Sequence, residues 1–429
     1  MKAMNIATRR DFLNRGLGIV GIGAALPNFM LNSSLAATAA SDDRIVVSLL
    51  LTGGPDGLSV VPPFTNDDYY KNRKVLAVQP KDALKLNDQF GLHPALAGCK
   101  SLYDQGQMAV VLGTGYPNFN LSHFSGRNIW EAGNDGVGDI PKSSATGWLG
   151  RYVDHACKGN PDPTLNVAVG AGNLPLIIKG RDHLGIGFTS PDSFKFLGDK
   201  TEKGRSVYGK LNQLSGEMKE MKEAQAPLTA DDLQFITRTA VNANDASAKL
   251  GDLAGKYQTP VAYPDTDFGV SVKAIAGFIN GGLPTRAYYA AQGIAVFGGY
   301  DTHADQPRRL AQLLEELNQT MTAFYKDLAR CGNAKRVLTF TYSEFGRRVK
   351  ENQSGGTDHG LAQPMFLFGP GVKPGIHGTQ PSLTDLDERG NLKMTTDFRG
   401  VYAAILEKWL RVPSESVLGK KVPLMDCLA

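Results

Sequence analysis

Short runs of apolar and β-branched residues recur along the chain, and longer polar or helical stretches separate them. The runs cover residues 45–51, 108–112, 165–169, 176–178, 294–297, 337–340 and 365–368. Runs as continuous as these are typical of strands that are buried on both faces of a sheet. Because helical stretches lie between them, the pattern predicts an α/β fold with a mostly parallel central sheet flanked by helices.

A different composition interrupts this alternation in the middle of the chain. Residues from about 201 to 257 are rich in Lys, Glu, Ala, Gln and Asn, and Thr229-Ala230-Asp231-Asp232 has the acidic residues of a helix start. We expect a helical insertion over about 201–282, with a helix near 270–280, that covers the site or serves as a docking surface. Solvated helices would explain its individual charges equally well. A separate amphipathic helix is predicted over 310–328.

The N-terminus has the pattern of a twin-arginine signal peptide. Thr8-Arg9-Arg10-Asp11-Phe12-Leu13 precedes a weakly apolar stretch, 16–26, and the small residues 36–40. The apolar stretch is too short and too rich in glycine to anchor the chain in a bilayer. We therefore expect residues 1–39 to be removed on export, which leaves a domain over 40–429 in the periplasm or elsewhere outside the cytoplasm. A disordered N-terminal tail is the alternative.

The charge of the mature chain is close to zero. The formal net charge is +4, and the leader supplies +3 of it through Lys2, Arg9, Arg10 and Arg15 against Asp11. We therefore expect no nucleic acid or anionic membrane surface as the main partner. The four cysteines, which form no C-x-x-C pair, are Cys99, Cys157, Cys331 and Cys427. They argue against a cysteine zinc site and leave any disulfide pairing open.

Polar, glycine-rich segments lie next to the predicted strands. They are 52–57, 113–115, 118–125, 298–303 and 342–348, each after a strand, and 355–360 before the last strand. In an open parallel sheet, ligands bind at the carboxyl ends of the strands. We therefore expect most of these segments to meet at one edge of the sheet.

These segments carry side chains that suit a divalent metal ion. The candidates are Asp56, Asp301, Glu344 and Asp358 with His123, His303 and His359. Carboxylates and neutral imidazoles are ligands of zinc, manganese and iron, and carboxylates brought close together need a cation to offset their repulsion. The sequence thus predicts a site for zinc, manganese or another divalent metal.

Each candidate also has a structural explanation. Asp56 could hold a turn beside glycine, and His123 could be a buried histidine bonded to a carbonyl group. Glu344 could pair with Arg347 or Arg348. The pairs Asp301 with His303 and Asp358 with His359 are the strongest candidates, because acid and imidazole occur together beside glycines.

The same stretches resemble the domain of unknown function 1501 family, a group of bacterial proteins exported by the twin-arginine route. The matching segments are 53–58, 90–96, 122–124 with 130–131, 147–152, 300–303, 343–348, 356–360 and 396–399. They follow one another in order along nearly the whole mature chain. That family is in turn similar to the alkaline phosphatase and sulfatase superfamily, most clearly from Asp358-His359-Gly360 through 364–371. The resemblance implies an alkaline phosphatase-like α/β domain.

The resemblance also implies a mechanism of metal-assisted ester hydrolysis on a small-molecule substrate. Ser122 would match the nucleophile after the second strand, and Arg347 would stabilise charge that develops on the ester oxygens. Asp56, Asp301, His303, Glu344, Asp358 and His359 would form the metal site. Ser125 is a rival to Ser122 as the nucleophile.

Two departures from the superfamily pattern leave a second hypothesis open. Glu344-Phe345 stands where Asp-His is usual, and Asp301-x-His303 stands where Asp-x-x-x-His is usual. One metal position is then lost, or rebuilt with His123 or Asp305. The first hypothesis is a metal-dependent hydrolase of phosphate or sulfate esters in the cell envelope. The alternative is a catalytically weakened relative that binds a ligand or a protein partner.

Overall fold

The computed structural model describes residues 43–136, 145–158, 162–189, 250–293 and 298–429. The predicted signal peptide, the helix start at 229–232, most of the predicted insertion and the run at 294–297 lie outside the described residues. Within them, no helix is both long and apolar enough to pass through a membrane. The predictions of export and of domain boundaries remain predictions.

A nine-stranded mixed sheet forms the centre of the protein. In spatial order its strands are β12 (Gly375–His377), β4 (Met108–Gly115), β11 (Gln363–Phe368), β8 (Val337–Tyr342), β1 (Ile45–Leu51), β7 (Ala287–Gln292), β5 (Asn166–Val169) and β6 (Ile186–Phe188), and β13 (Thr396–Asp397) also pairs with β4. Only β11 runs antiparallel to its neighbours among these strands. The predicted mostly parallel central sheet is confirmed.

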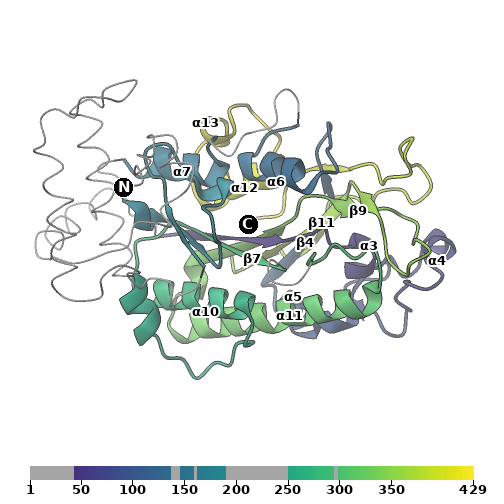
Figure 1. The fold of residues 1–429 in the computed structure, drawn as a ribbon, viewed down its shortest axis with the longest axis horizontal. Helices are drawn as coiled ribbons and strands as arrows, with labels where there is room; N and C mark the ends of the chain where they lie inside the picture. The colour runs from purple at the N-terminus through teal and green to yellow at the C-terminus, as the bar shows by residue number, and fades with distance from the viewer. Residues whose placement is uncertain (1–42, 137–144, 159–161, 190–249, 294–297) are drawn as a thin grey trace, which may run out of the picture.

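Helices cover both faces of this sheet (Figure 1). One layer contains α5 (Ala97–Asp104), α10 (Asp267–Asn280) and α11 (Gln306–Arg330), and the other contains α6 (His123–Ala132), α7 (Trp148–Ala156), α12 (Phe398–Ala404) and α13 (Ser414–Leu418). α11 confirms the helix predicted over 310–328 and extends beyond it at both ends. Its buried stripe, which includes Leu310, Leu314, Leu317 and Met321, recurs at helical spacing and faces the sheet.

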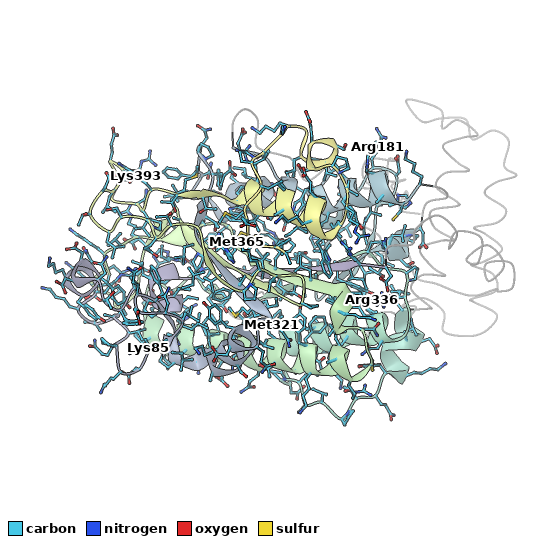
Figure 2. All side chains as sticks on the ribbon, turned by 180° about the vertical axis from the view of Figure 1, so that it is seen from behind. Lys85, Arg181, Met321, Arg336, Met365 and Lys393 are labelled. Carbon is cyan, nitrogen blue, oxygen red and sulfur yellow. The ribbon has the colours of Figure 1, made fainter. Side chains whose placement is uncertain are left out.

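The central strand β1 shows why continuous apolar runs suit this position. Val47, Leu49 and Leu51 belong to the core under α10 and α11, whereas Val46 and Leu50 belong to the core under the opposite helices. Alternate side chains of a strand point to opposite faces, so a strand covered on both sides needs apolar residues throughout. Figure 2 shows one residue of each core, Met321 and Met365, and both are fully buried.

Two strand predictions need correction. Residues 176–178 form a short 3-10 helix, η4 (Leu176–Ile178), directly after Pro175, and not a strand. The strand β7 was not predicted, because its sequence Ala-Tyr-Tyr-Ala-Ala-Gln lacks β-branched residues. Its pairing with β1 and β5, and not its own propensity, makes it a strand.

The remaining elements are short. They are α3 (Gly57–Val60), α4 (Asp67–Asn72), the pair β2 (Leu84–Lys85) and β3 (Gly91–Leu92), the pair β9 (Gly346–Arg347) and β10 (His359–Gly360), the 3-10 helices η2 (Pro94–Leu96), η3 (Pro163–Leu165) and η6 (Ala334–Arg336), and the π-helical turn η7 (Ile405–Trp409). The four cysteines form no disulfide in the described structure.

The reversed direction of β11 explains how the predicted site segments meet. Gln363, at the start of β11, pairs with Thr114 near the end of β4. The segment that enters β11 therefore lies at the same edge of the sheet as the segments that leave β1, β4 and β8. The antiparallel pair β9 and β10, with Arg347 opposite His359, joins two of these segments.

Candidate metal centre

Close backbone packing fixes the position of Asp301. The amide of Tyr300 donates to the carbonyl of Thr52, and the amide of Asp301 donates to the carbonyl of Gly298. Gly53 adopts φ +107°, and a Cβ atom there would clash with the backbone nitrogen of Asp301. Glycine is therefore required at position 53, because any side chain would push the Asp301 loop away from the end of β1.

One carboxylate and three imidazoles converge at this edge. Oδ1 of Asp301 lies 3.0 Å from Nε2 of His303 and 3.0 Å from Nε2 of His359, and these two nitrogens are 3.1 Å apart. Nε2 of His123 lies 3.6 Å from Oδ2 of Asp301. In a tetrahedral site with bonds of about 2.0–2.1 Å, ligand atoms lie about 3.3–3.4 Å apart. The contacts of His303 and His359 with Oδ1 are slightly shorter than this spacing, and His123 lies a little farther away on Oδ2.

Among the described residues, His123, Asp301 and His359 form a group with metal-ligand spacing. His303, which is more exposed, adds a fourth donor beside Asp301 and His359. Nitrogen and oxygen donors in this ratio suit zinc or manganese better than a hard oxygen-seeking ion such as calcium. The sequence named His123 among the candidate side chains at this edge and, with Asp305, as a way to rebuild a lost metal position.

The second nitrogen of each imidazole is held by an oxygen atom. The Nδ1 contacts are His303 with Oδ1 of Asp358 at 3.2 Å, His359 with the carbonyl of Leu121 at 3.1 Å, and His123 with Oε1 of Glu344 at 3.6 Å. In metal-binding histidines, an oxygen acceptor at Nδ1 keeps the proton there and leaves the lone pair on Nε2 for the metal ion. The geometry therefore turns all three Nε2 atoms toward Asp301.

Glu344 supports the cluster from inside the protein. Its buried carboxylate accepts hydrogen bonds from the amide of Gly53 at 2.9 and 3.1 Å and from the hydroxyl of Ser343 at 2.7 Å. Burial raises the pKa of Glu344, but its contacts with His123, Ser343 and Gly53 outweigh burial and lower the pKa below its usual value. Glu344 is thus an anion that orients His123.

The charges of the cluster depend on one another. Contacts with Asp301 and Glu344 raise the pKa of His123 to about 9, against the effect of burial. Burial raises the pKa of Asp301, yet contacts with His123, His359 and Arg347 hold it well below its usual range. Without a cation, His123 is therefore an imidazolium at neutral pH, and a metal ion must displace that proton to bind its Nε2 atom.

Arg347 lies under the cluster with its hydrogen-bonding groups already engaged. Its Nε donates to the carbonyl of Gly54 at 2.8 Å, and Nη1 donates to the carbonyl of Thr357 at 2.8 Å. Nη2 donates to the carbonyl of Gly53 and to Oδ1 of Asp301, the latter at 2.5 Å. A side chain that is fully buried and bonded in this way holds Asp301 in place and has little capacity left for a substrate.

Asp56 does not join the other candidates. It forms a buried ion pair with Arg73, at 2.5 and 2.9 Å, and also accepts hydrogen bonds from Ser59 and Gln306, both at 2.6 Å. Burial raises the pKa of Asp56, but Arg73 more than offsets this and lowers the pKa. The structure therefore places this carboxylate in an internal ion pair and not toward the cluster formed by Asp301.

The remaining candidates lie around the rim. The side chain of Asp358 is half exposed, and its carboxylate contacts His303. Ser122 is the exposed N-cap residue of α6, directly before His123, and its hydroxyl makes no capping hydrogen bond. Asp305 is exposed and pairs with Arg308, so it does not rebuild the metal position.

The ring of Phe345 lies beside two of the imidazoles. Its centroid lies 4.3 Å from that of His359 and 4.8 Å from that of His123. A Cβ atom on Gly54 would meet the same ring. Phe345 thus contributes an apolar wall that packs against the imidazoles of His123 and His359.

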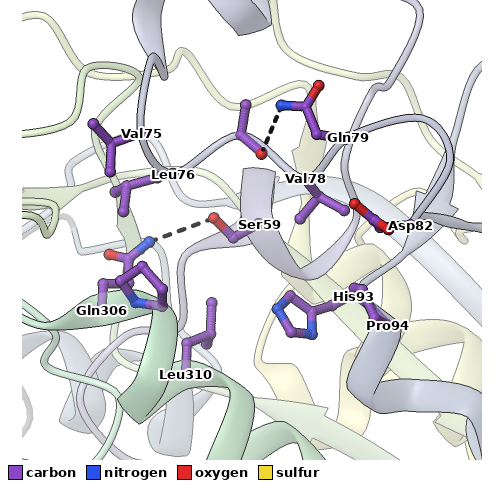
Figure 3. Close-up of a pocket in the computed structure, with 12 residues that line it drawn as sticks. Ser59, Val75, Leu76, Val78, Gln79, Asp82, His93, Pro94, Gln306 and Leu310 are labelled. Carbon is purple, nitrogen blue, oxygen red and sulfur yellow. Dashed lines mark hydrogen bonds between the residues drawn. The ribbon is translucent and has the colours of Figure 1, made fainter.

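A cavity of about 260 Å³ lies beside Ser59 and Gln306, two hydrogen-bond partners of Asp56 (Figure 3). Ser59, His93, Gln306 and Leu310 are among the residues that line it. The Nδ1 atom of His93 accepts a hydrogen bond from the amide of Ala95, and burial lowers the pKa of His93 to about 4. Histidine 93 is therefore neutral at physiological pH.

Comparison with solved structures gives distant similarities only. The PsFucS1 sulfatase from Pseudoalteromonas sp. has 12% identity, with 94% of this chain and 78% of that chain covered and a TM-score of 0.35. The alkaline phosphatase from the Antarctic bacterium TAB5 has 11% identity, 76% and 91% coverage and a TM-score of 0.30. The zinc complex of the C-terminal periplasmic domain of EcEptC from Escherichia coli has 9% identity, 77% and 74% coverage and a TM-score of 0.33. Superpositions this loose assign no role to any residue.

The sequence comparison is more specific. No curated protein matches the chain. A family described as "Protein of unknown function (DUF1501)" matches residues 43–418, which include the central sheet and every candidate ligand. The family predicted from the sequence motifs is confirmed: this chain belongs to the DUF1501 family.

Proposed function

We propose that this protein is a metal-dependent hydrolase of phosphate or sulfate esters that acts in the cell envelope after twin-arginine export. The observation that carries the proposal is the convergence of Nε2 atoms from His123, His303 and His359 on the carboxylate of Asp301. In each imidazole an oxygen atom holds Nδ1. Metal-binding histidines commonly have such an oxygen partner at the second ring nitrogen.

The residues fit a divalent cation such as zinc or manganese, and each has a distinct role. A bound cation would supply Lewis-acid polarisation of the ester group. Asp301 and the imidazoles would hold the cation, Glu344 and Asp358 orient His123 and His303, and Arg347 fixes the Asp301 carboxylate.

Ser122 is the proposed nucleophile, because its free hydroxyl begins the helix that carries His123. Its oxygen bonds to phosphorus or sulfur as the bond to the ester oxygen breaks, and the proton of the hydroxyl ends on the departing alcohol. Water then attacks the same atom, releases inorganic phosphate or sulfate and restores the Ser122 hydroxyl. The sum of the two steps is hydrolysis of the ester by one water molecule.

A second candidate function is a catalytically weakened relative that binds a ligand or partner. The observation in its favour is Phe345, whose ring contacts His123 and His359 and cannot coordinate a metal ion. This alternative predicts stable binding without turnover.

Metal analysis of protein purified after native export tests the proposal. We expect stoichiometric metal in the wild type and loss of it in Asp301→Ala and His359→Ala. Asp305→Ala is the matched control, since Asp305 is an exposed acid at the same edge that pairs only with Arg308. Folded wild-type protein without metal would remove the hydrolase proposal. A panel of phosphate and sulfate esters then separates the two functions, because only the hydrolase turns an ester over and loses that activity in Ser122→Ala.

A further inference from the structure

The guanidinium group of Arg127 is fixed on two sides and open on the third. Its Nε donates to Oε1 of Glu131 at 2.7 Å, and its Nη2 donates to the hydroxyl of Tyr289 at 2.9 Å. The two N–H groups of Nη1 have no hydrogen-bond acceptor among the described residues, and 31% of the side chain is exposed. Arg127 therefore presents an unused pair of donors to solvent.

The anchor of Arg127 is rigid. Glu131 is buried and also accepts hydrogen bonds from the hydroxyl of Tyr342 at 3.0 Å and from the amide of Ile177 at 3.3 Å. Tyr289 is buried in the central strand β7. A guanidinium held in this way loses little conformational entropy when an anion binds to its open edge.

Arg127 lies close to the candidate metal centre. It follows His123 by four residues on α6, so the two side chains share one face of the helix at an axial separation of about 6 Å. The same helix packs against the site through Gly126, whose Cβ position would meet the carbonyl of Glu344. Arg127 and the metal ligands thus flank the same edge of the sheet.

Two other arginines near the site have no comparable open edge. Arg347 and Arg73 are fully buried, and the guanidinium group of each donates hydrogen bonds to a carboxylate and to backbone carbonyls. Arg127 is instead anchored through Nε and Nη2 alone. The charge-stabilising role that the sequence suggested for Arg347 therefore suits Arg127 better.

We infer that Arg127 binds the tetrahedral oxyanion group of the substrate, with two N–H donors of Nη1 on its oxygens. This inference rests on the proposed function and specifies its substrate recognition. Guanidinium donors match the oxygen spacing of phosphate and sulfate groups, and an arginine of fixed orientation selects such groups over neutral esters. Glu131 and Tyr289 are positioning residues, because they act only through Arg127.

Binding of inorganic phosphate and of inorganic sulfate to the metal-loaded protein, measured by calorimetry, tests the inference without requiring turnover. We expect Arg127→Met to weaken binding by roughly 30-fold, the effect of losing a charged hydrogen bond, with its metal content unchanged. Arg127→Lys retains a cation beside the buried Glu131 and should fold even where the Met variant does not, with an intermediate affinity. Arg308→Met is the matched control, since it removes the same charge from an exposed side chain paired with Asp305.

The outcomes separate the inference from the proposed function. Three outcomes would overturn the role of Arg127: both Arg127 variants bind the anions with unchanged affinity, the Lys variant loses its metal, or the wild-type protein binds neither anion. Arg127-dependent binding without hydrolysis of any ester supports the inference and removes the proposed function instead. The comparison of phosphate with sulfate identifies which oxyanion the site accepts.

Discussion

The ion pair of Asp56 and Arg73 yields a prediction that separates structure from metal binding. The Asp56 side chain is 1% exposed and the Arg73 side chain 0% exposed, and the pair is joined by two hydrogen bonds. Replacing Asp56 with Asn leaves a buried guanidinium without its counter-charge. Removal of one partner from a buried pair typically costs about 3–5 kcal/mol of unfolding free energy.

The double variant refines the magnitude. In Asp56→Asn/Arg73→Met neither charge remains, so the loss should be smaller than in Asp56→Asn alone. It should not vanish, because Arg73 also donates to the carbonyls of Arg348 and Val349, and unpaired buried carbonyls cost about 1–3 kcal/mol. Denaturant unfolding of each purified variant measures these values. Asp426→Asn is the control, since its ion pairs with Lys373 and Lys408 are exposed and should contribute far less to stability than the buried pair.

The metal content of the same variants completes this test. We expect Asp56→Asn to keep its metal wherever it remains folded, because its carboxylate faces Arg73 and not Asp301. A variant of unchanged stability that loses its metal would refute the reasoning and restore Asp56 as the ligand that the sequence suggested.

Three further predictions concern protons and backbone geometry. Burial lowers the pKa of His93 to about 4, so between pH 6.5 and 4 the unfolded chain binds a proton that the folded protein does not. The free energy of unfolding should therefore fall by up to about 3 kcal/mol as the pH drops from about 6.5 to 4. In urea titrations at several pH values, His93→Gln should remove this dependence. Metal uptake should release a proton below pH 9, because contacts with Asp301 and Glu344 raise the pKa of His123 to about 9; pH-stat titration should detect the proton in the wild type and not in His123→Gln. Gly53→Ala should destabilise the protein by about 1–3 kcal/mol and lower metal occupancy, because φ is +107° at this position and the new Cβ atom would displace Asp301. A variant with wild-type Tm and full metal occupancy would count against this role of Gly53.

The fold was predictable where burial alone decided the sequence. The run at 45–51 coincides with β1, and the runs at 337–340 and 365–368 lie within β8 and β11, because strands covered on both faces must be apolar throughout. β7 was missed, because Ala and Tyr occur in helices, strands and loops, and only pairing with neighbouring strands makes this segment a strand. The short apolar segment at 176–178 was misassigned because burial does not distinguish a strand from a 3-10 turn over three residues.

The site was predictable in its acid and imidazole pairs, which were identified by their position next to strands. The structure brings Asp301, His303 and His359 together with His123, a weaker candidate in the sequence, and leaves Asp358 at the rim. Whether they bind a metal stays a prediction. The partner of Asp56 could not be foreseen, because nothing in the sequence around Arg73 signals a buried cation.

Arg127 was overlooked for a different reason. Its spacing of four residues from both His123 and Glu131 on one helix was the available signal. An arginine followed by a glutamate at this spacing usually forms a surface ion pair, so only the burial of Glu131 sets this pair apart.

The paired strands β9 and β10 have a consequence for how this site can change. They belong to one uninterrupted connection from β8 to β11, and that connection carries Glu344, Phe345, Arg347, Asp358 and His359. One of the four candidate ligands, His359, is therefore encoded with several supporting residues in a single stretch that leaves and re-enters the sheet at one edge. Exchange of this stretch between related chains would replace that ligand, the apolar wall and the supporting arginine together, while the strands on either side keep their places.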